Sequence, residues 1–249
     1  MIPLRDINPV QTRPVVTYVL IAINVVVWLC EVAVLLTAGP HELGVLVSEW
    51  GMVPDKLLGP GHPMDWLTPL TSMFMHGGWF HVIGNMWFLW VFGDNVEDAL
   101  GRPRYVAFYV LCGLAAVVAQ VAIDPGSSVP MVGASGAIAG VLAAYVVLYP
   151  RARVLTLVPI FIFIQFVELP AFLFIFVWFG MQLLSGYASL GDMGEGGTAF
   201  FAHIGGFIAG LALVFLLRRR GRGTRSGRRV VHRPGRRREP WSLDDRPPY

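Results

Sequence analysis

The sequence contains few charged residues. Only 14% of its 249 residues are Asp, Glu, Lys or Arg, whereas soluble domains carry about 25%. Hydrophobic residues make up 55% of the chain, and the mean hydropathy is +0.60. The apolar residues come in long runs. This excludes an ordinary soluble domain and is typical of a protein that spans a membrane.

The apolar runs also lack the alternation of polar and apolar residues that marks a transmembrane barrel. Helices are the other structure that satisfies backbone hydrogen bonds in lipid. We therefore expect an all-α, polytopic membrane protein with six transmembrane helices. They are predicted at residues 15–36, 79–98, 105–123, 133–149, 169–189 and 199–217.

Cysteine is scarce as well. Cys30 and Cys112 both fall inside predicted spans, so a disulfide framework is not expected. The first apolar run is longer than the core of a signal peptide, and no A-x-A cleavage pattern follows it. We expect this run to remain as a membrane span.

Lysine occurs once, as Lys56, and the arginines predict the orientation. With six spans, 18 of the 19 Lys and Arg residues lie on one side: Arg5, Arg13, Arg102, Arg104, Arg151, Arg153 and the twelve arginines from Arg218 onward. Cytoplasmic loops carry such an excess of positive charge. Both termini are therefore expected in the cytoplasm, and the location expected is a prokaryotic cell membrane.

Composition divides the chain into three parts. Residues 1–14 form a short N-terminal lead, residues 15–217 the six-helix membrane domain, and residues 218–249 a basic tail. The tail has almost no apolar residues and is expected to be disordered and attracted to anionic lipids. Within the membrane domain, residues 150–168 are interrupted by proline and are expected to form an interfacial connection on the cytoplasmic side.

Polar side chains occur in the first turns of three predicted helices that run in the same direction. They are His81 and Asn85, then Ser135, then His203. A serine beside a histidine is the minimum for an activated nucleophile. Backbone N–H groups at a helix start favour a developing oxyanion, and a side-chain donor from a third helix completes such a site.

No carboxylate is expected at the depth of His203. The pattern therefore predicts acyl transfer by a Ser135–His203 dyad, with His81 and Asn85 as oxyanion donors.

Glycines predict how two of these helices pack. Gly136 and Gly140 form one G-x-x-x-G pattern, and Gly206 and Gly210 form another. Small residues at this spacing let helix backbones approach closely. Because His203 shares a helix face with Gly206 and Gly210, packing the two patterns together brings His203 towards Ser135.

The order and spacing of these residues resemble the rhomboid intramembrane serine proteases. The resemblance covers roughly residues 15–217, and the matching positions are His81, Asn85, Gly133, Ala134, Ser135, Gly136, Ala202, His203, Gly206 and Gly210. It implies a six-helix bundle in which Ser135 is the nucleophile and His203 the base, with His81 and Asn85 in the oxyanion hole. It also implies transmembrane proteins as substrates and no cofactor.

One position departs from this family. Some members carry a tyrosine one turn after the serine, stacked on the catalytic histidine, and Ala139 stands there in this chain. The pattern also differs from the G-x-S-x-G elbow of soluble hydrolases, because Ala137 replaces the last glycine. The motifs therefore do not indicate what holds the His203 ring.

Three other interpretations stay open. The glycines and serine serve helix packing alone in many membrane proteins. A protease-like protein that binds membrane helices without cutting them is a second possibility, which the intact Ser135 and His203 oppose. A small transporter or channel is the third, although the polar residues cluster in the outer third of the predicted membrane domain.

Two classes of ligand are not expected. His76 and His81 are five residues apart and lack the spacing of a metal-binding helix, so no metal site is predicted. A basic tract such as the tail also occurs in nucleic-acid-binding proteins, but nothing else in the sequence supports that partner.

Overall fold

The computed structural model describes residues 2–60, 62–160, 163–189 and 200–218. The strands are β1 (Ile2–Asp6), β2 (Arg153–Ile160) and β3 (Phe163–Pro170). The long helices are α1 (Val15–Ala38), α5 (Trp79–Leu100), α6 (Arg102–Ile123), α7 (Ser135–Leu148), α8 (Ala171–Ser189) and α9 (Phe200–Leu217). Between α1 and α5 lie α2 (Pro40–Trp50), α3 (Pro54–Leu58), the 3-10 turn η1 (Pro63–Leu67), α4 (Thr68–Thr71) and the 3-10 turn η2 (Ser72–Phe74).

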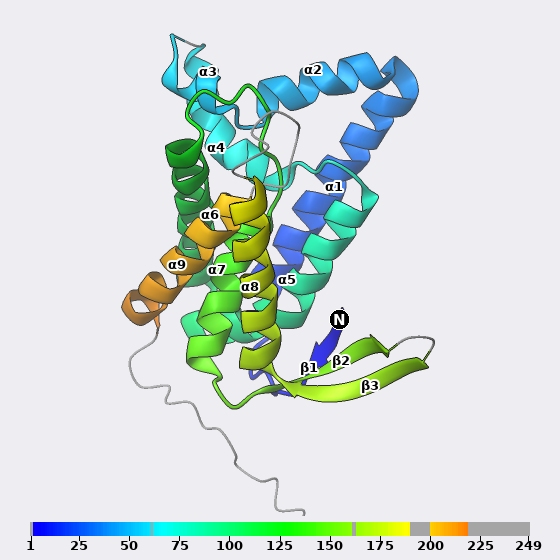
Figure 1. Ribbon diagram of the computed structural model, residues 1–249, viewed down its shortest axis with the longest axis vertical. Helices are drawn as coiled ribbons and strands as arrows, with labels where there is room; N and C mark the ends of the chain where they lie inside the picture. The colour runs from blue at the N-terminus through cyan, green and yellow to red at the C-terminus, as the bar shows by residue number, and fades with distance from the viewer. Residues whose placement is uncertain (1, 61, 161–162, 190–199, 219–249) are drawn as a thin grey trace, which may run out of the picture.

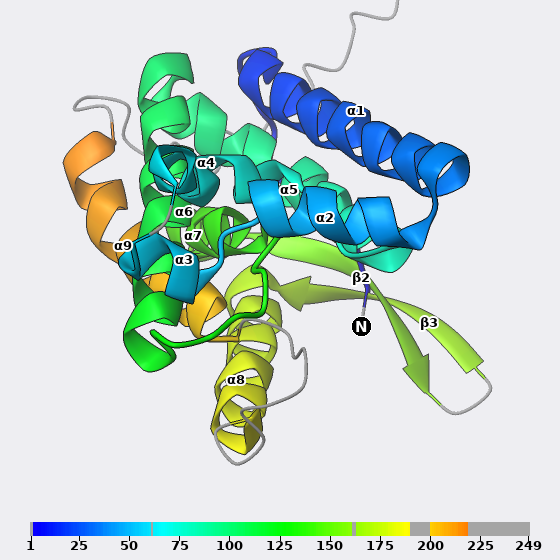
Figure 2. The same ribbon diagram turned by 90° about the horizontal axis from the view of Figure 1, so that it is seen from above.

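Helix α7 occupies the centre of the bundle (Figures 1 and 2). It contacts α5, α6, α8 and α9, and every residue from Gly136 to Tyr145 is buried. Many of these residues are glycine or alanine, which let neighbouring helices come close. This arrangement encloses the helix that begins at Ser135.

Three helices of the described residues are long and apolar enough to cross a membrane: α1, α6 and α9. Helix α7 and the Ala171–Met181 part of α8 are apolar but shorter. The chain is therefore mostly helical with three candidate spans. The count of six stays a prediction.

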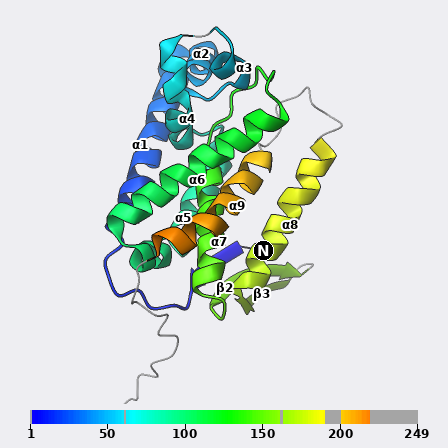
Figure 3. The same cartoon turned by 90° about the vertical axis from the view of Figure 1, so that its left-hand side faces the viewer.

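A three-stranded antiparallel sheet, ordered β1-β2-β3, lies at one end of the bundle (Figures 1 and 3). The all-α prediction is wrong in this respect, because β1 comes from the predicted lead and β2–β3 from the predicted interfacial connection. The physical reason is local composition: the hairpin is rich in β-branched and aromatic residues, which favour strands, and prolines exclude a helix there.

The N-terminal strand is held by a buried polar cluster. Asp6 accepts hydrogen bonds from Asn95 Nδ2 on α5 at 2.6 Å and from the hydroxyl of Tyr145 on α7 at 2.8 Å. Burial raises the pKa of the Asp6 carboxyl to about 7, against the hydrogen bond from Tyr145, which lowers it. The docked strand therefore favours the protonated carboxyl.

This cluster predicts a pH-dependent stability. In the unfolded chain Asp6 titrates near 3.8, so the folded protein binds more protons between that pH and about 7. The contribution of Asp6 is complete at low pH and is lost as the pH rises through 7. We expect the melting temperature of the wild type to fall relative to that of Asp6→Asn between pH 5 and 8. Parallel profiles for the two proteins would contradict this assignment.

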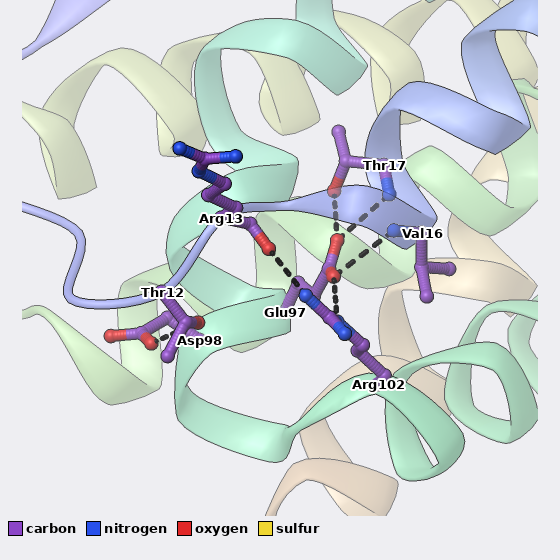
Figure 4. Close-up of polar contacts among 7 residues, drawn as sticks. All are labelled: Thr12, Arg13, Val16, Thr17, Glu97, Asp98 and Arg102. Carbon is purple, nitrogen blue, oxygen red and sulfur yellow. Dashed lines mark hydrogen bonds and ion pairs between the residues drawn. The ribbon is translucent and has the colours of Figure 1, made fainter.

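The start of α1 is capped by a side chain from α5. The Glu97 carboxylate accepts hydrogen bonds from the backbone N–H groups of Val16 at 3.0 Å and Thr17 at 2.7 Å, and from the Thr17 hydroxyl at 2.8 Å (Figure 4). Arg102 lies 3.9 Å from the same carboxylate. An acid at the end of a helix is unfavourable for that helix, but here it stabilises the positive start of its neighbour.

Replacing Glu97 by alanine should therefore lower the free energy of unfolding by about 3 kcal/mol, because two buried donors and one partly buried donor lose their acceptor. The matched control is Glu168→Ala. Glu168 is half exposed and pairs with Arg153 at 3.8 Å, so its loss should cost about 0–1 kcal/mol. Thermal unfolding in detergent measures both, and equal losses would show that Glu97 does not anchor α1.

Candidate active site

Ser135 is the first residue of α7 and follows a loop that is held from two sides. Met131 exchanges backbone hydrogen bonds with Met52, and the Gly133 N–H donates to the Ser72 carbonyl at 2.8 Å. Gly133 has φ +126°, a conformation that L side chains rarely adopt. The sequence predicts this helix from residue 133, but it begins two residues later. The Ser135 hydroxyl therefore stands on the first turn, directly after a fixed loop.

His203 reaches Ser135 from the first turn of α9. Its Nε2 lies 2.7 Å from Ser135 Oγ, within hydrogen-bond distance. The His203 ring is buried, and the indole of Trp178 on α8 lies beside it, with ring centroids 5.9 Å apart. The sequence motifs do not point to Trp178, which flanks the ring in a protein with Ala139 in place of a tyrosine.

Helices α7 and α9 meet backbone to backbone at their glycines. A Cβ added at Gly206 would overlap the carbonyl oxygen of Gly136, and one added at Gly210 would lie 2.6 Å from the Gly140 Cα. Real side chains essentially never come so close. The separation of Ser135 and His203 is therefore set by the contact between two main chains.

Replacing Gly206 by alanine should push α9 away from α7. We expect a loss of about 1–3 kcal/mol in the free energy of unfolding, as for other overpacked sites. We also expect a weaker reaction of Ser135 with serine-directed reagents. Gly84→Ala on α5 is the matched control, since nothing lies within 4 Å of a Cβ added there. A Gly206→Ala protein as stable and reactive as Gly84→Ala would contradict the close contact.

His81 and Asn85 on α5 both reach the loop before Ser135. The position of an added Gly133 Cβ lies 2.7 Å from His81 Nε2 and 3.6 Å from Asn85 Nδ2. The Gly77 N–H donates to His81 Nδ1 at 3.3 Å, so a neutral His81 ring carries its proton on Nε2. Asn85 Nδ2 is buried and has no hydrogen-bond partner among the described residues. Two N–H donors thus converge on Gly133, two residues before Ser135.

A second layer of residues supports His81. The His76 ring contacts the His81 ring edge to face, with centroids 5.1 Å apart. The backbone N–H of His76 donates to the Glu31 carboxylate of α1, at 3.2 and 3.3 Å to its two oxygens. The buried Glu31 carboxylate thus supports His81 through His76. Spacing alone does not reveal these contacts, because Glu31 lies 45 positions before His76.

A small cavity adjoins Ser135. Its volume is about 20 Å³, which is enough for about one water molecule. It is lined by the first turn of α7, residues 131–133, Ser72, Met73, Ala202 and three residues of α6. A water molecule or a small side chain can therefore occupy space next to the serine.

Residues 63–220, more than half of the chain, match the family model of the Rhomboid domain. The chain belongs to the rhomboid family. This rhomboid is 37% identical over 99 residues to the mitochondrial presenilin-associated rhomboid-like protein of Mus musculus. It is also 32% identical over 142 residues to Rhomboid protease GluP of Bacillus subtilis, and 29% identical over 157 residues to the chloroplastic Rhomboid-like protein 11 of Arabidopsis thaliana.

These matches cover only parts of the proteins compared. They take in 38%, 56% and 61% of this rhomboid, and 26%, 26% and 52% of the mouse, Bacillus and Arabidopsis proteins respectively. The chain thus spans about a quarter of the length of the first two relatives. Family membership and the apolar helices together identify it as a membrane protein.

Proposed function

We propose that this rhomboid is a serine endopeptidase that hydrolyses peptide bonds in or near transmembrane segments of membrane proteins. The observation that carries the proposal is the 2.7 Å contact between Ser135 Oγ and His203 Nε2 at the start of α7. The family relation supports it, since one relative is named as a rhomboid protease. No cofactor is required for this chemistry.

The first step is attack on the substrate carbonyl. His203 Nε2 accepts the proton of the Ser135 hydroxyl as Oγ bonds to the carbonyl carbon, and the carbonyl oxygen becomes negative. The first N–H groups of α7 have no partner within the helix and favour a negative charge. Asn85 Nδ2 and His81 Nε2 supply further hydrogen bonds from α5.

The second step releases the products. His203 returns its proton to the leaving amine, and the C–N bond breaks to leave an acyl group on Ser135. A water molecule then loses a proton to His203 and attacks this ester. The bond between the acyl carbon and Ser135 Oγ breaks, His203 returns the proton to Oγ, and the new carboxylic acid leaves. The cavity beside Ser135 has room for that water. Trp178 holds the His203 ring in position through both steps.

The arrangement in the membrane is part of the proposal. The β1–α1, α5–α6 and α7–β2 connections lie at the sheet end of the bundle, with arginines in them or in the adjoining ends of the helices and strands. Lys56 on α3 lies at the other end (Figure 1). This distribution supports an orientation with the sheet end and both termini in the cytoplasm. The membrane that we propose is a prokaryotic cell membrane. The proposed arrangement has six transmembrane helices within residues 15–217.

The partners are transmembrane substrates and membrane lipids, and no nucleic acid is proposed. The basic tail is proposed to meet anionic lipids. Apart from Arg218, it lies outside the described residues.

Labelling with a serine-directed phosphonate tests the proposal. We expect the wild-type protein in liposomes to be labelled at Ser135, and Ser135→Ala to remain unlabelled. The matched control is Ser72→Ala, which removes a second serine from the same cavity and should leave labelling intact. Labelling that persists in Ser135→Ala would overturn the proposal. A wild type that is not labelled would favour the non-cleaving or transport alternatives.

A further inference from the structure

The β2–β3 hairpin projects sideways from the bundle. β1 pairs only with residues Val154 to Leu157 of β2, and the rest of the hairpin runs outwards, across the direction of the long helices (Figures 1 and 2). Among the described residues, β3 is one of the two edge strands of the sheet. The hairpin therefore presents an open edge and two faces to its surroundings.

Both faces of β3 carry exposed apolar side chains, each beside one exposed polar residue, Gln165 or Glu168. Successive side chains of a strand point to opposite faces, and Phe163 and Phe166 therefore lie on different sides of the sheet. Each is 65% exposed, and Ile164 is 60% exposed. In water such a two-faced apolar edge strand promotes aggregation. Its surroundings in the native protein are therefore not bulk water.

The apolar surface of the hairpin continues onto a helix. β3 runs directly into α8, whose Phe172 and Phe176 are exposed as well. Helix α8 packs into the bundle through Phe174 and Ile175, which are buried. Its exposed apolar side thus faces away from the protein core, towards lipid in a membrane protein. The hairpin extends this same surface outwards.

Charges mark the depth at which the hairpin lies. Arg151 and Arg153 are exposed at its base, and Arg153 pairs with Glu168. Exposed arginines at a membrane-protein surface favour the phosphate level of the headgroups, and anionic lipids attract them. An open strand edge cannot lie in the middle of the hydrocarbon, where its backbone groups would have no partners. The headgroup boundary satisfies both constraints.

We propose that the β2–β3 hairpin is an interfacial lipid anchor, lying along the leaflet at the sheet end of the bundle. Phe163, Ile164 and Phe166 reach the upper acyl chains, the open strand edge bonds to headgroups and water, and Arg151 and Arg153 contact lipid phosphates. This binding surface is independent of the proposed protease activity, since it involves neither Ser135 nor His203.

Spin-label accessibility tests this anchor. The exposed Cys30 is replaced by alanine, and single cysteines are placed at Phe163 and Phe166, on opposite faces of β3. Phe176→Cys on α8 serves as the lipid control and Glu42→Cys on α2 as the water control. The labelled full-length proteins are placed in vesicles of equal phosphatidylcholine and phosphatidylglycerol. Collision rates with oxygen and with a water-soluble nickel chelate are then measured.

We expect the oxygen-to-nickel ratio at both hairpin positions to approach that of Phe176 and to exceed that of Glu42 several-fold. A ratio like that of Glu42 at both positions would place the hairpin in water and overturn the proposal. Low collision rates with both reagents, with spin–spin broadening, would show a second copy on the hairpin and overturn it too. Because two faces are probed, a label that disturbs folding at one position leaves the other as the test.

Discussion

Cleavage of a reporter transmembrane substrate should stop when either Ser135 or His203 is replaced by alanine. We expect the rate to fall by roughly 10⁴-fold or more in each case, because proton transfer and attack depend on the two side chains together. For the same reason, the double variant should be no slower than either single one. Turnover in liposomes, measured for all four proteins, checks the non-additivity.

The folding control for this prediction is the melting temperature. Ser135 and His203 contact each other through one hydrogen bond, whose loss should cost only about 1 kcal/mol. His203→Ala also removes a buried ring that packs on Trp178, so turnover is compared at a temperature at which all four proteins are folded. Sustained cleavage by Ser135→Ala would refute the nucleophile, and losses that multiply in the double variant would refute the coupled pair.

The second large effect is expected at Asn85. Its Nδ2 group is buried beside the Gly133 backbone with no partner among the described residues, so it is available to a charge that develops during the reaction. Losing one such donor costs about 10²–10³ in turnover, or roughly 3–4 kcal/mol. Asn85→Ala should therefore cleave slowly while Ser135 still reacts detectably with a phosphonate.

Asn24→Ala provides the matched control. Asn24 is also a buried amide in a long helix, but it donates to the Leu20 carbonyl of its own helix, away from the site. Both variants should lose some stability, and only Asn85→Ala should lose turnover at a temperature where both are folded. If Asn85→Ala and Asn24→Ala both lose activity only as they unfold, Asn85 contributes to stability and not to the reaction. His81→Ala should also slow turnover, because its Nε2 faces the same backbone.

Local sequence patterns predicted most of the helical architecture. The long helices follow apolar runs, whose ends are marked by residues such as Pro14, Gly39, Gly101 and Pro170. Local spacing also predicted the four polar residues of the site. His81 and Asn85 share a helix face because they are four residues apart, and His203 shares a face with Gly206 and Gly210. The contact between Ser135 and His203 then follows from packing small residues together.

Contacts between distant segments could not be predicted in this way. The sheet forms only when residues 2–6 pair with residues 154–157, and the sequence of residues 2–6 does not indicate which segment they pair with. The local sequence does not indicate the role of Glu97 at the end of α5, because its carboxylate accepts hydrogen bonds from the start of a different helix, α1. Trp178 likewise looked like one aromatic residue among many in an apolar helix, and only the approach of α8 to α9 places it beside His203.

The β1–β2 pairing also has a consequence for the order of folding. β1 is synthesised long before β2. Ile2 can pair with Leu157 only after α1, α5, α6 and α7 have been synthesised. Closing so long a loop is slow, and local helices form earlier. The N-terminal strand must therefore stay unpaired during most of membrane insertion. Its docking onto Asn95 and Tyr145 closes the chain late in assembly, once the helix that carries the serine is in place.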